Sequence, residues 1–255
     1  MVEYARKGLI GVLTPQANTT VEPEFAILMP PGYAFLNARM VSDRPTIEGR
    51  LDEYFATIEN SVARFANAPM GAVAFACTGA SYLQGLERER AAVEAIERAR
   101  GIGFLTAGRA VAEALERLGA RRLGLVSPYP PSLTDASIAY WRAHGFDVVT
   151  VSGGFDASSK FHPIYDRSAS SGEEALAAID LKSVDAVVML GTGVPTLGPI
   201  LKYAGNGSAV PVLSCMSALA WRSLVEFEPA LRERHAMRRY FDGEGWRERF
   251  ARAMS

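Results

Sequence analysis

The chain repeats one strand-and-loop sequence: residues 72–83 read AVAFACTGASYL, and residues 186–197 read AVVMLGTGVPTL. A second pair, IGVLTP at 10–15 and LGLVSP at 123–128, recurs in the same order and at nearly the same spacing. Internal self-similarity of this kind indicates that one supersecondary unit is present twice. Short apolar strands also resemble one another by chance, but the preserved order and spacing favour a duplication.

Each copy alternates short apolar runs with amphipathic segments. Strands are expected at residues 8–14, 35–41, 72–76 and 103–105 of the first copy, and at 122–127, 146–151, 186–190 and 210–213 of the second. Helices are expected at residues 48–67, 86–99, 107–118 and 172–179. Apolar strands separated by helices are typical of parallel sheets covered on both faces. The sequence therefore predicts an α/β fold: two similar doubly wound parallel-sheet lobes, related by a pseudo-twofold axis, with the active site in the cleft between them.

The repeat also predicts the division of the chain. We expect a first lobe at residues 1–107, a second lobe at 108–215, and a C-terminal segment at 216–255 that packs back on the first lobe. Residues 228–255 mix arginines with acids and with aromatic residues such as Trp246 and Phe250, which is typical of an amphipathic helix. Such a helix covers either the fold itself or a second subunit, so a homo-oligomer stays open.

Composition narrows the classes of partner. The 255 residues include 27 basic and 28 acidic side chains, a formal net charge of −1, which argues against nucleic acid as a partner. No apolar run approaches the roughly 20 residues that span a bilayer, and the N-terminus lacks signal-peptide features. We therefore expect no membrane partner and a cytoplasmic location. Two cysteines and three histidines without metal-ligand spacing, and no nucleotide-binding motif, predict no metal and no cofactor.

Cys77 is the candidate catalytic residue of the first copy. It ends a strand and opens a helix, where backbone N–H groups and the helix dipole stabilise a thiolate. Thr78 adds a hydroxyl and an N–H for an anion, and Gly79 lets a ligand approach the backbone closely. The alternative is a small buried core cysteine. The position of Cys77 in the repeat favours the catalytic interpretation over the core one.

The matching loop of the second copy has no thiol. Gly191 stands where the repeat would place one, and Thr192 offers a second anion-binding hydroxyl opposite Thr78. Gly193 completes this candidate substrate-binding loop, although an ordinary glycine turn explains the same residues. Cys215 follows a later strand of the second copy, and we interpret it as a packing or domain-junction residue.

Three further residues are candidates in neighbouring loops. Prolines on both sides hold Tyr129 rigidly, so that its phenol can donate to an oxyanion, or it is simply a packing tyrosine. The amide of Asn18 can bind a carboxylate, although Asn is also a preferred helix N-cap. His162 lies after the second strand of its copy and could reach the cleft, although an exposed loop histidine is the commoner outcome.

At these residues the chain resembles the Asp/Glu racemase superfamily, and within it the branch of maleate cis-trans isomerases and arylmalonate decarboxylases. The resemblance covers about residues 8–225 and rests on PQANTT at 15–20, ACT at 76–78, PY at 128–129 and PVLS at 211–214. It implies a cofactor-free site between two similar lobes, with cysteines flanking a small carboxylate substrate. Carried over, Cys77 is the first-lobe thiol, and Asn18, Thr78 and Tyr129 match carboxylate-binding positions. Gly191 departs from the isomerases and racemases, which have their second cysteine there.

The single thiol leaves three functions open. A cis-trans isomerase of a maleate-like dicarboxylate would add the Cys77 thiolate to the alkene, rotate the new single bond and expel the thiolate. An arylmalonate-type decarboxylase would use Cys77 to protonate the enediolate left by CO2. A non-catalytic small-acid binding protein would use neither step. Racemisation is disfavoured, because it needs an acid and a base on opposite faces. Fast alkylation of Cys77 at neutral pH, with protection by dicarboxylates, is expected of the enzymes.

Overall fold

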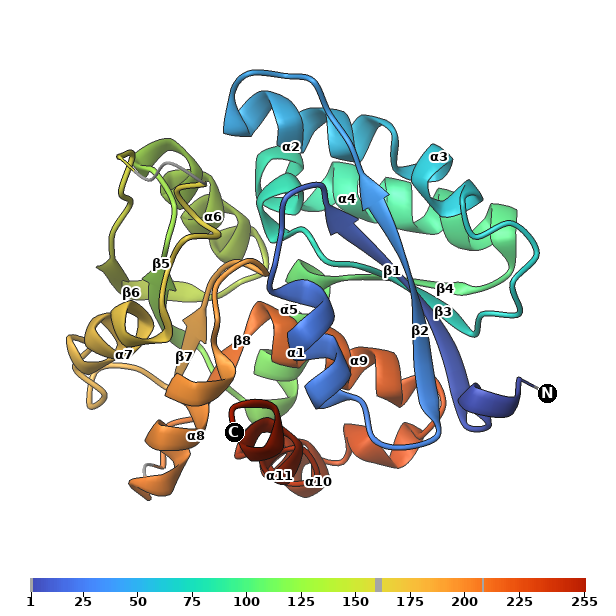
Figure 1. Ribbon diagram of the computed structural model, residues 1–255. Helices are drawn as coiled ribbons and strands as arrows, with labels where there is room; N and C mark the ends of the chain where they lie inside the picture. Colours follow the sequence, from blue (N-terminus) through green and yellow to red (C-terminus); the bar gives the residue numbers. More distant parts are fainter. Residues whose placement is uncertain (1, 159–161, 208) are drawn as a thin grey trace.

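The computed structural model describes residues 2–158, 162–207 and 209–255, which form two parallel sheets of four strands each (Figure 1). The first has the order β2-β1-β3-β4, built from β1 (Gly8–Pro15), β2 (Tyr33–Met40), β3 (Ala72–Phe75) and β4 (Gly103–Thr106). The second has the order β6-β5-β7-β8, built from β5 (Arg122–Ser127), β6 (Asp147–Gly153), β7 (Ala186–Met189) and β8 (Val212–Ser214). The equal order confirms the predicted pair of similar lobes; we call them the first and the second lobe by their sheets.

Burial explains why these residues form the central strands. All eight residues of β1, and all four of β3 and of β7, are buried. Helices cover both faces of a central parallel strand, so both faces select apolar side chains. Ile10 pairs with Ala72 in the first sheet, and their repeat counterparts Leu123 and Ala186 pair in the second. The duplicated residues therefore occupy equivalent positions in the two lobes.

Helices alternate with the strands and cover both faces of the sheets. In chain order they are α1 (Val21–Leu28), α2 (Ile47–Ala56), α3 (Ile58–Ala63), α4 (Thr78–Arg100), α5 (Ala107–Leu118), α6 (Pro131–Ala143), α7 (Ala169–Ala177), α8 (Leu197–Gly205), α9 (Cys215–Val225), α10 (Arg234–Phe241) and α11 (Arg247–Ala253). Figure 1 shows α2, α3 and α4 on one side of the first sheet and α1 and α9 on the other. This is the doubly wound arrangement that the alternating pattern predicted.

Two helices differ from the sequence prediction. The helix expected at residues 48–67 is in fact α2 and α3, because the backbone leaves the helical region at Thr57 (φ −106°, ψ 18°). The helix expected at residues 86–99 begins earlier, at Thr78. Gly85, with a positive φ of 72°, kinks this helix without ending it.

The C-terminal helices pack on the chain itself. Helix α9 contacts β3, β4 and α5, and α11 contacts both α1 and α8. Trp246 is buried and donates its indole N–H to the carbonyl of Tyr240, at 2.8 Å. The segment that the sequence predicted as one amphipathic helix therefore contains the two helices α10 and α11.

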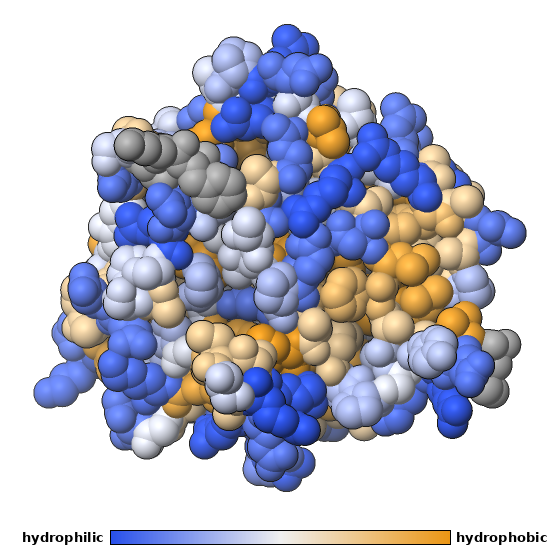
Figure 2. All heavy atoms as spheres, viewed as in Figure 1, coloured by the Kyte–Doolittle hydropathy of each residue, from blue (hydrophilic) through white to orange (hydrophobic). Residues whose placement is uncertain are grey.

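The outer surface is mostly hydrophilic. Figure 2 shows hydrophobic side chains gathered on the right-hand side of this face, over the edge strand β2, where Leu36 is 40% exposed. Among the described residues, no helix combines the length and the apolar character that crossing a bilayer requires.

Candidate active site

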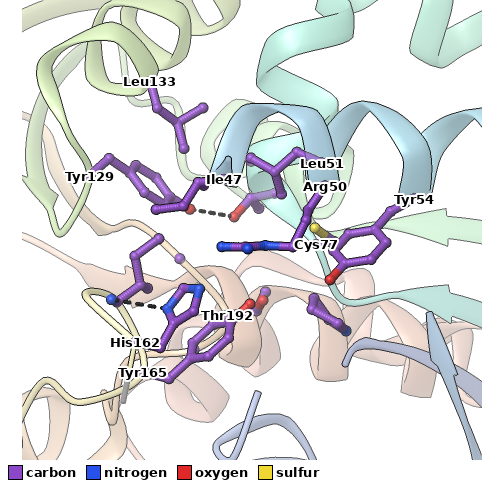
Figure 3. Close-up of a pocket in the computed structure, with 16 residues that line it drawn as sticks. Ile47, Arg50, Leu51, Tyr54, Cys77, Tyr129, Leu133, His162, Tyr165 and Thr192 are labelled. Atoms are coloured by element: carbon purple, nitrogen blue, oxygen red, sulfur yellow. Dashed lines mark hydrogen bonds between the residues drawn. The ribbon is translucent and has the colours of Figure 1, made fainter. Parts of the chain in front are cut away.

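A pocket lies between the two lobes, beyond the carboxyl ends of the strands (Figure 3). This is the position at which open α/β sheets bind ligands. The described residues that line it are Pro15, Ile47, Arg50, Leu51, Tyr54, Cys77, Thr78, Gly79, Tyr129, Leu133, His162, Ile164, Tyr165, Gly191, Thr192 and Gly193. Of the residues that the sequence singled out for catalysis or substrate binding, all but Asn18 are among them.

Cys77 is the N-cap residue of α4, directly after β3. Its side chain is buried, and burial raises its pKa to about 12, although a hydrogen bond with the backbone of Ala80 lowers it. The expectation that the helix terminus stabilises a thiolate is therefore wrong for this structure, because desolvation of the charge outweighs the helix N–H. At neutral pH the group in the pocket is a neutral thiol.

Thr78 and Tyr129 form a hydroxyl pair that joins the two lobes. Their Oγ and Oη atoms are 3.0 Å apart. The backbone N–H of Tyr129 donates to Oγ of Ser127, at 3.3 Å, which fixes the start of its loop. Burial raises the pKa of Tyr129 well above its ordinary value, so the group stays a phenol. When Thr78 donates to Tyr129, the phenol proton of Tyr129 is left for the oxygen of a ligand.

The glycine loop of the second lobe closes the opposite wall. Gly191 has a φ of 89°, and a Cβ there would lie 3.3 Å from Oη of Tyr129. A cysteine at this position would therefore be strained and would press on the Thr78–Tyr129 pair. The hydroxyl of Thr192 donates to the carbonyl of Ala76, at 2.7 Å. Its proton therefore links the lobes instead of facing a ligand.

Asn18 lies behind Gly193 and not in the pocket wall. Its Oδ1 accepts the backbone N–H groups of Thr20 and Val21, at 2.9 and 3.1 Å, and so caps the start of α1. Its Nδ2 is buried without a hydrogen-bond partner among the described residues. A Cβ at Gly193 would lie 2.2 Å from the ring of Tyr165 and 3.2 Å from this Nδ2. The side chain of Asn18 thus accepts hydrogen bonds at the start of α1 through Oδ1 and keeps Nδ2 as a donor beside the pocket.

Helix α2 adds four lining residues that the sequence analysis missed: Ile47, Arg50, Leu51 and Tyr54. Their i, i+3, i+4 and i+7 spacing is that of one helix face. Figure 3 shows Arg50 reaching from α2 across the pocket, with its guanidinium between Tyr129 and His162. The sequence feature that could have revealed this face is Arg50, an arginine among apolar and aromatic residues spaced along one side of the helix.

The electrostatics of the pocket follow from Arg50. No Asp or Glu lines the pocket among the residues that the structure describes. The pKa of Tyr54 is raised to about 12, by burial and then by its closeness to Cys77. Among the described lining residues, one guanidinium is therefore the only charged group, and it favours an anion in the pocket.

His162 belongs to the pocket wall. It is half-buried, and its ring stacks on Tyr165 with centroids 3.9 Å apart and planes at 12°. Its Nδ1 accepts the backbone N–H of Ile164, at 3.2 Å. Burial, and then the charge of Arg50, lower its pKa to about 4, so the imidazole is neutral and its Nε2 carries the proton. The interpretation of His162 as an exposed loop residue is therefore wrong.

Cys215 lies behind the pocket and is fully buried. Its sulfur is 3.8 Å from the hydroxyl of Tyr82. Burial raises its pKa to about 11, while hydrogen bonds with Tyr82, the backbone of Gly191 and the hydroxyl of Thr78 lower it. It packs against the site without lining it.

The sequence profile of the arylmalonate decarboxylase family matches residues 10–238 of the chain. The chain belongs to this family. The maleate isomerase of Nocardia farcinica is 29% identical over 231 residues, which cover 84% of this chain and 88% of that protein. The maleate isomerase of Geobacillus stearothermophilus is 24% identical, over 84% of this chain and 90% of that protein.

Solved structures of this family have the same fold. The Nocardia farcinica maleate cis-trans isomerase, in a mutant with a covalently bound succinylcysteine intermediate, is 27% identical with a TM-score of 0.73, covering 87% of this chain and 93% of that one. An arylmalonate decarboxylase structure is 18% identical with a TM-score of 0.70, covering 85% and 91%. These matches confirm the predicted family and fold, and the prediction of an enzyme of the maleate isomerase or arylmalonate decarboxylase kind.

Proposed function

We propose that the protein is a cofactor-independent cis-trans isomerase of a small unsaturated dicarboxylate, with maleate as the type substrate. The observation that carries this proposal is the thiol of Cys77 in a pocket that holds hydroxyl donors and a cation but, among its described lining residues, no acid. A succinylcysteine intermediate is bound in the Nocardia farcinica relative, which supports covalent chemistry at a cysteine.

The reaction starts from the neutral thiol of Cys77. The S–H bond breaks, sulfur bonds to one alkene carbon, and the proton goes to the other carbon by way of an enediolate. The remaining proton of the Thr78–Tyr129 pair stabilises an enediolate oxygen. The carbon–carbon bond is now single and rotates. Reversal of the addition returns the proton to sulfur and releases the trans product.

A second candidate is decarboxylation of a substituted malonate, and the high pKa of Cys77 favours it. A thiol that keeps its proton at neutral pH is suited to protonate an enediolate once CO2 has left. Arg50 opposes this function, however. Loss of CO2 is promoted by an apolar surrounding for the departing carboxylate, whereas a guanidinium in the pocket stabilises that carboxylate. We therefore rank isomerisation first.

Both reactions are tested by incubating the protein with maleate or phenylmalonate and following the products by proton NMR. Fumarate from maleate supports the isomerase, and phenylacetate from phenylmalonate supports the decarboxylase. Cys77→Ala is expected to abolish either activity, and turnover that survives it overturns the mechanism. Cys215→Ala removes the other thiol as the matched control, with a far smaller loss expected. No turnover, together with binding of maleate in isothermal titration calorimetry, would identify a binding protein instead.

We also propose a cytosolic location, because both cysteines of the chain are free thiols in the structure, as a reducing compartment would keep them. Non-reducing electrophoresis of protein from alkylated cell extracts tests this. A disulfide-linked form as the main species would contradict the proposal.

A further inference from the structure

Arg50 stands out because of the face of α2 on which it lies. The other three residues of that face, Ile47, Leu51 and Tyr54, are apolar or aromatic and line the pocket with it. A charged group is costly on a half-buried apolar face unless an opposite charge compensates it. An arginine that points into a pocket from such a face is therefore stabilised when an anion is bound inside the pocket.

The acids of α2 do not supply that anion. Each is hydrogen-bonded to a side chain elsewhere: Glu48 to Ser132 at 2.9 Å, Asp52 to Gln84 at 2.7 Å and Glu53 to Ser42 at 2.5 Å. The guanidinium of Arg50 itself donates to the backbone carbonyls of Arg44 and Pro45, at 3.3 and 3.4 Å. These bonds are long and their acceptors are neutral, so a carboxylate would replace them favourably.

Arg50 comes from a different element than the hydroxyl donors. Its guanidinium lies between Tyr129 and His162 (Figure 3) and is carried by α2, whereas Thr78 opens α4 and Tyr129 follows β5. A substrate carboxylate held by those donors would leave Arg50 to a second carboxylate on the same molecule. The neutral Nε2–H of His162 is a further donor beside that second group.

We propose that Arg50 binds the second carboxylate of the substrate and makes the pocket selective for dianionic over monoanionic acids of the same shape. This inference rests on the proposed function only in taking the Cys77 pocket as the substrate site. Arg50 is accordingly a binding residue for specificity, and it takes no part in bond making.

The test compares maleate with maleamate, in which one carboxylate is an amide, by isothermal titration calorimetry. The wild type is expected to bind maleate about 10- to 100-fold more tightly than maleamate, as loss of one hydrogen-bonded charge pair implies. In Arg50→Leu this ratio should fall to near one. Arg50→Lys, which keeps the charge but loses the planar fork, should retain part of it. Arg44→Leu, an exposed arginine six residues earlier, should keep the wild-type ratio.

Circular dichroism and melting temperature establish that each variant is folded. If Arg50→Leu does not fold, the comparison is made with Arg50→Lys alone. An unchanged maleate-to-maleamate ratio in a folded Arg50 variant overturns the inference, and so does a wild type that binds both acids equally. Fumarate formation is measured separately. A wild type that prefers maleate but forms no fumarate contradicts the proposed reaction and leaves the role of Arg50 supported.

Discussion

The two equivalent loops of the duplicated fold, after β3 and after β7, differ in how a helix terminus is used. In the first lobe α4 begins at Thr78, directly after Cys77, so its terminus faces the pocket. In the second lobe α8 begins only at Leu197, and the carboxylate of Glu24 accepts the backbone N–H of Thr196, at 2.6 Å. Duplication thus supplied two anion sites of the same kind. One remains open to a ligand, and the protein's own side chain fills the other.

The difference between these two loops explains why the pocket contains a single thiol. With Gly191 at a positive φ and Tyr129 against it, the second wall positions a hydroxyl donor and has no room for a thiol. In the proposed mechanism the first lobe supplies the nucleophile, and the second lobe contributes the phenol of Tyr129 to the oxyanion donors. We expect three changes to break or sharpen this contrast, in decreasing order of effect.

The largest effect is expected from exchanging the two loop residues, Cys77→Gly with Gly191→Cys. The thiol would then sit on a strained residue against Tyr129, and activity should fall by about 10³-fold or more, as for loss of a nucleophile. Steady-state kinetics on maleate measures this. Gly191→Cys alone, which keeps Cys77, is the control and separates disturbance of the hydroxyl pair from loss of the thiol. An exchange variant as active as the wild type would show that the two walls are interchangeable.

A smaller effect is expected from Tyr129→Phe, which removes the donor that the second lobe contributes. Loss of one oxyanion donor typically lowers kcat by about 10²–10³-fold with little change in KM. Tyr203→Phe, a half-exposed tyrosine outside the pocket, is the matched control. A rise in KM at unchanged kcat would instead assign Tyr129 to ground-state binding.

The smallest effect concerns the filled helix terminus and is seen in stability. Burial raises the pKa of Glu24 to about 7, although hydrogen bonds with Thr196 and Leu197 lower it. The folded protein therefore binds a proton between about pH 4.5 and 7 that the unfolded chain has released, so this group's contribution to stability decreases as pH rises through that range. We expect the difference in unfolding free energy between the wild type and Glu24→Gln to change by about 1–3 kcal/mol across it.

Urea denaturation at pH 5, 6, 7 and 8 measures that difference. His162 and His144, with pKa values lowered to about 4, contribute stability that is lost as pH falls below their ordinary values. They are common to the wild type and the variant, so they cancel. Glu59→Gln, on the exposed side of α3, is the matched control. A difference between the wild type and Glu24→Gln that stays constant from pH 5 to 8 would rule out titration of Glu24 in this range.

The sequence predicted those parts of the fold that local chemistry determines. Helix α5 has its expected bounds, because the side chain of Thr106 caps its start and Gly119, with a φ of 74°, ends it. The strand-end loops were predictable because the duplication showed them twice. The pocket-lining face of α2 was not predicted, because its residues line a pocket only once the fold brings the second lobe next to them.

The protonation state of Cys77 was beyond prediction for a related reason. A helix terminus is visible in the sequence, whereas the desolvation that opposes it comes from residues distant in the chain. The same applies to His162, whose stacking on Tyr165 places it in the pocket wall. Site membership could be predicted from the repeat, but charge state depends on tertiary packing.

The hydrogen bonds between the lobes have a consequence for how a substrate reaches Cys77. Thr192 to Ala76, Thr20 to the carbonyl of Gly193 and Glu24 to Thr196 are all buried. Swinging the lobes apart like a hinge would break all of them at once. Helix α2 is fastened to its surroundings through exposed side-chain bonds, such as Glu48 to Ser132. An opening beside α2, which also packs on α4, would leave the buried bonds between the lobes intact, and a substrate entering there would meet Arg50.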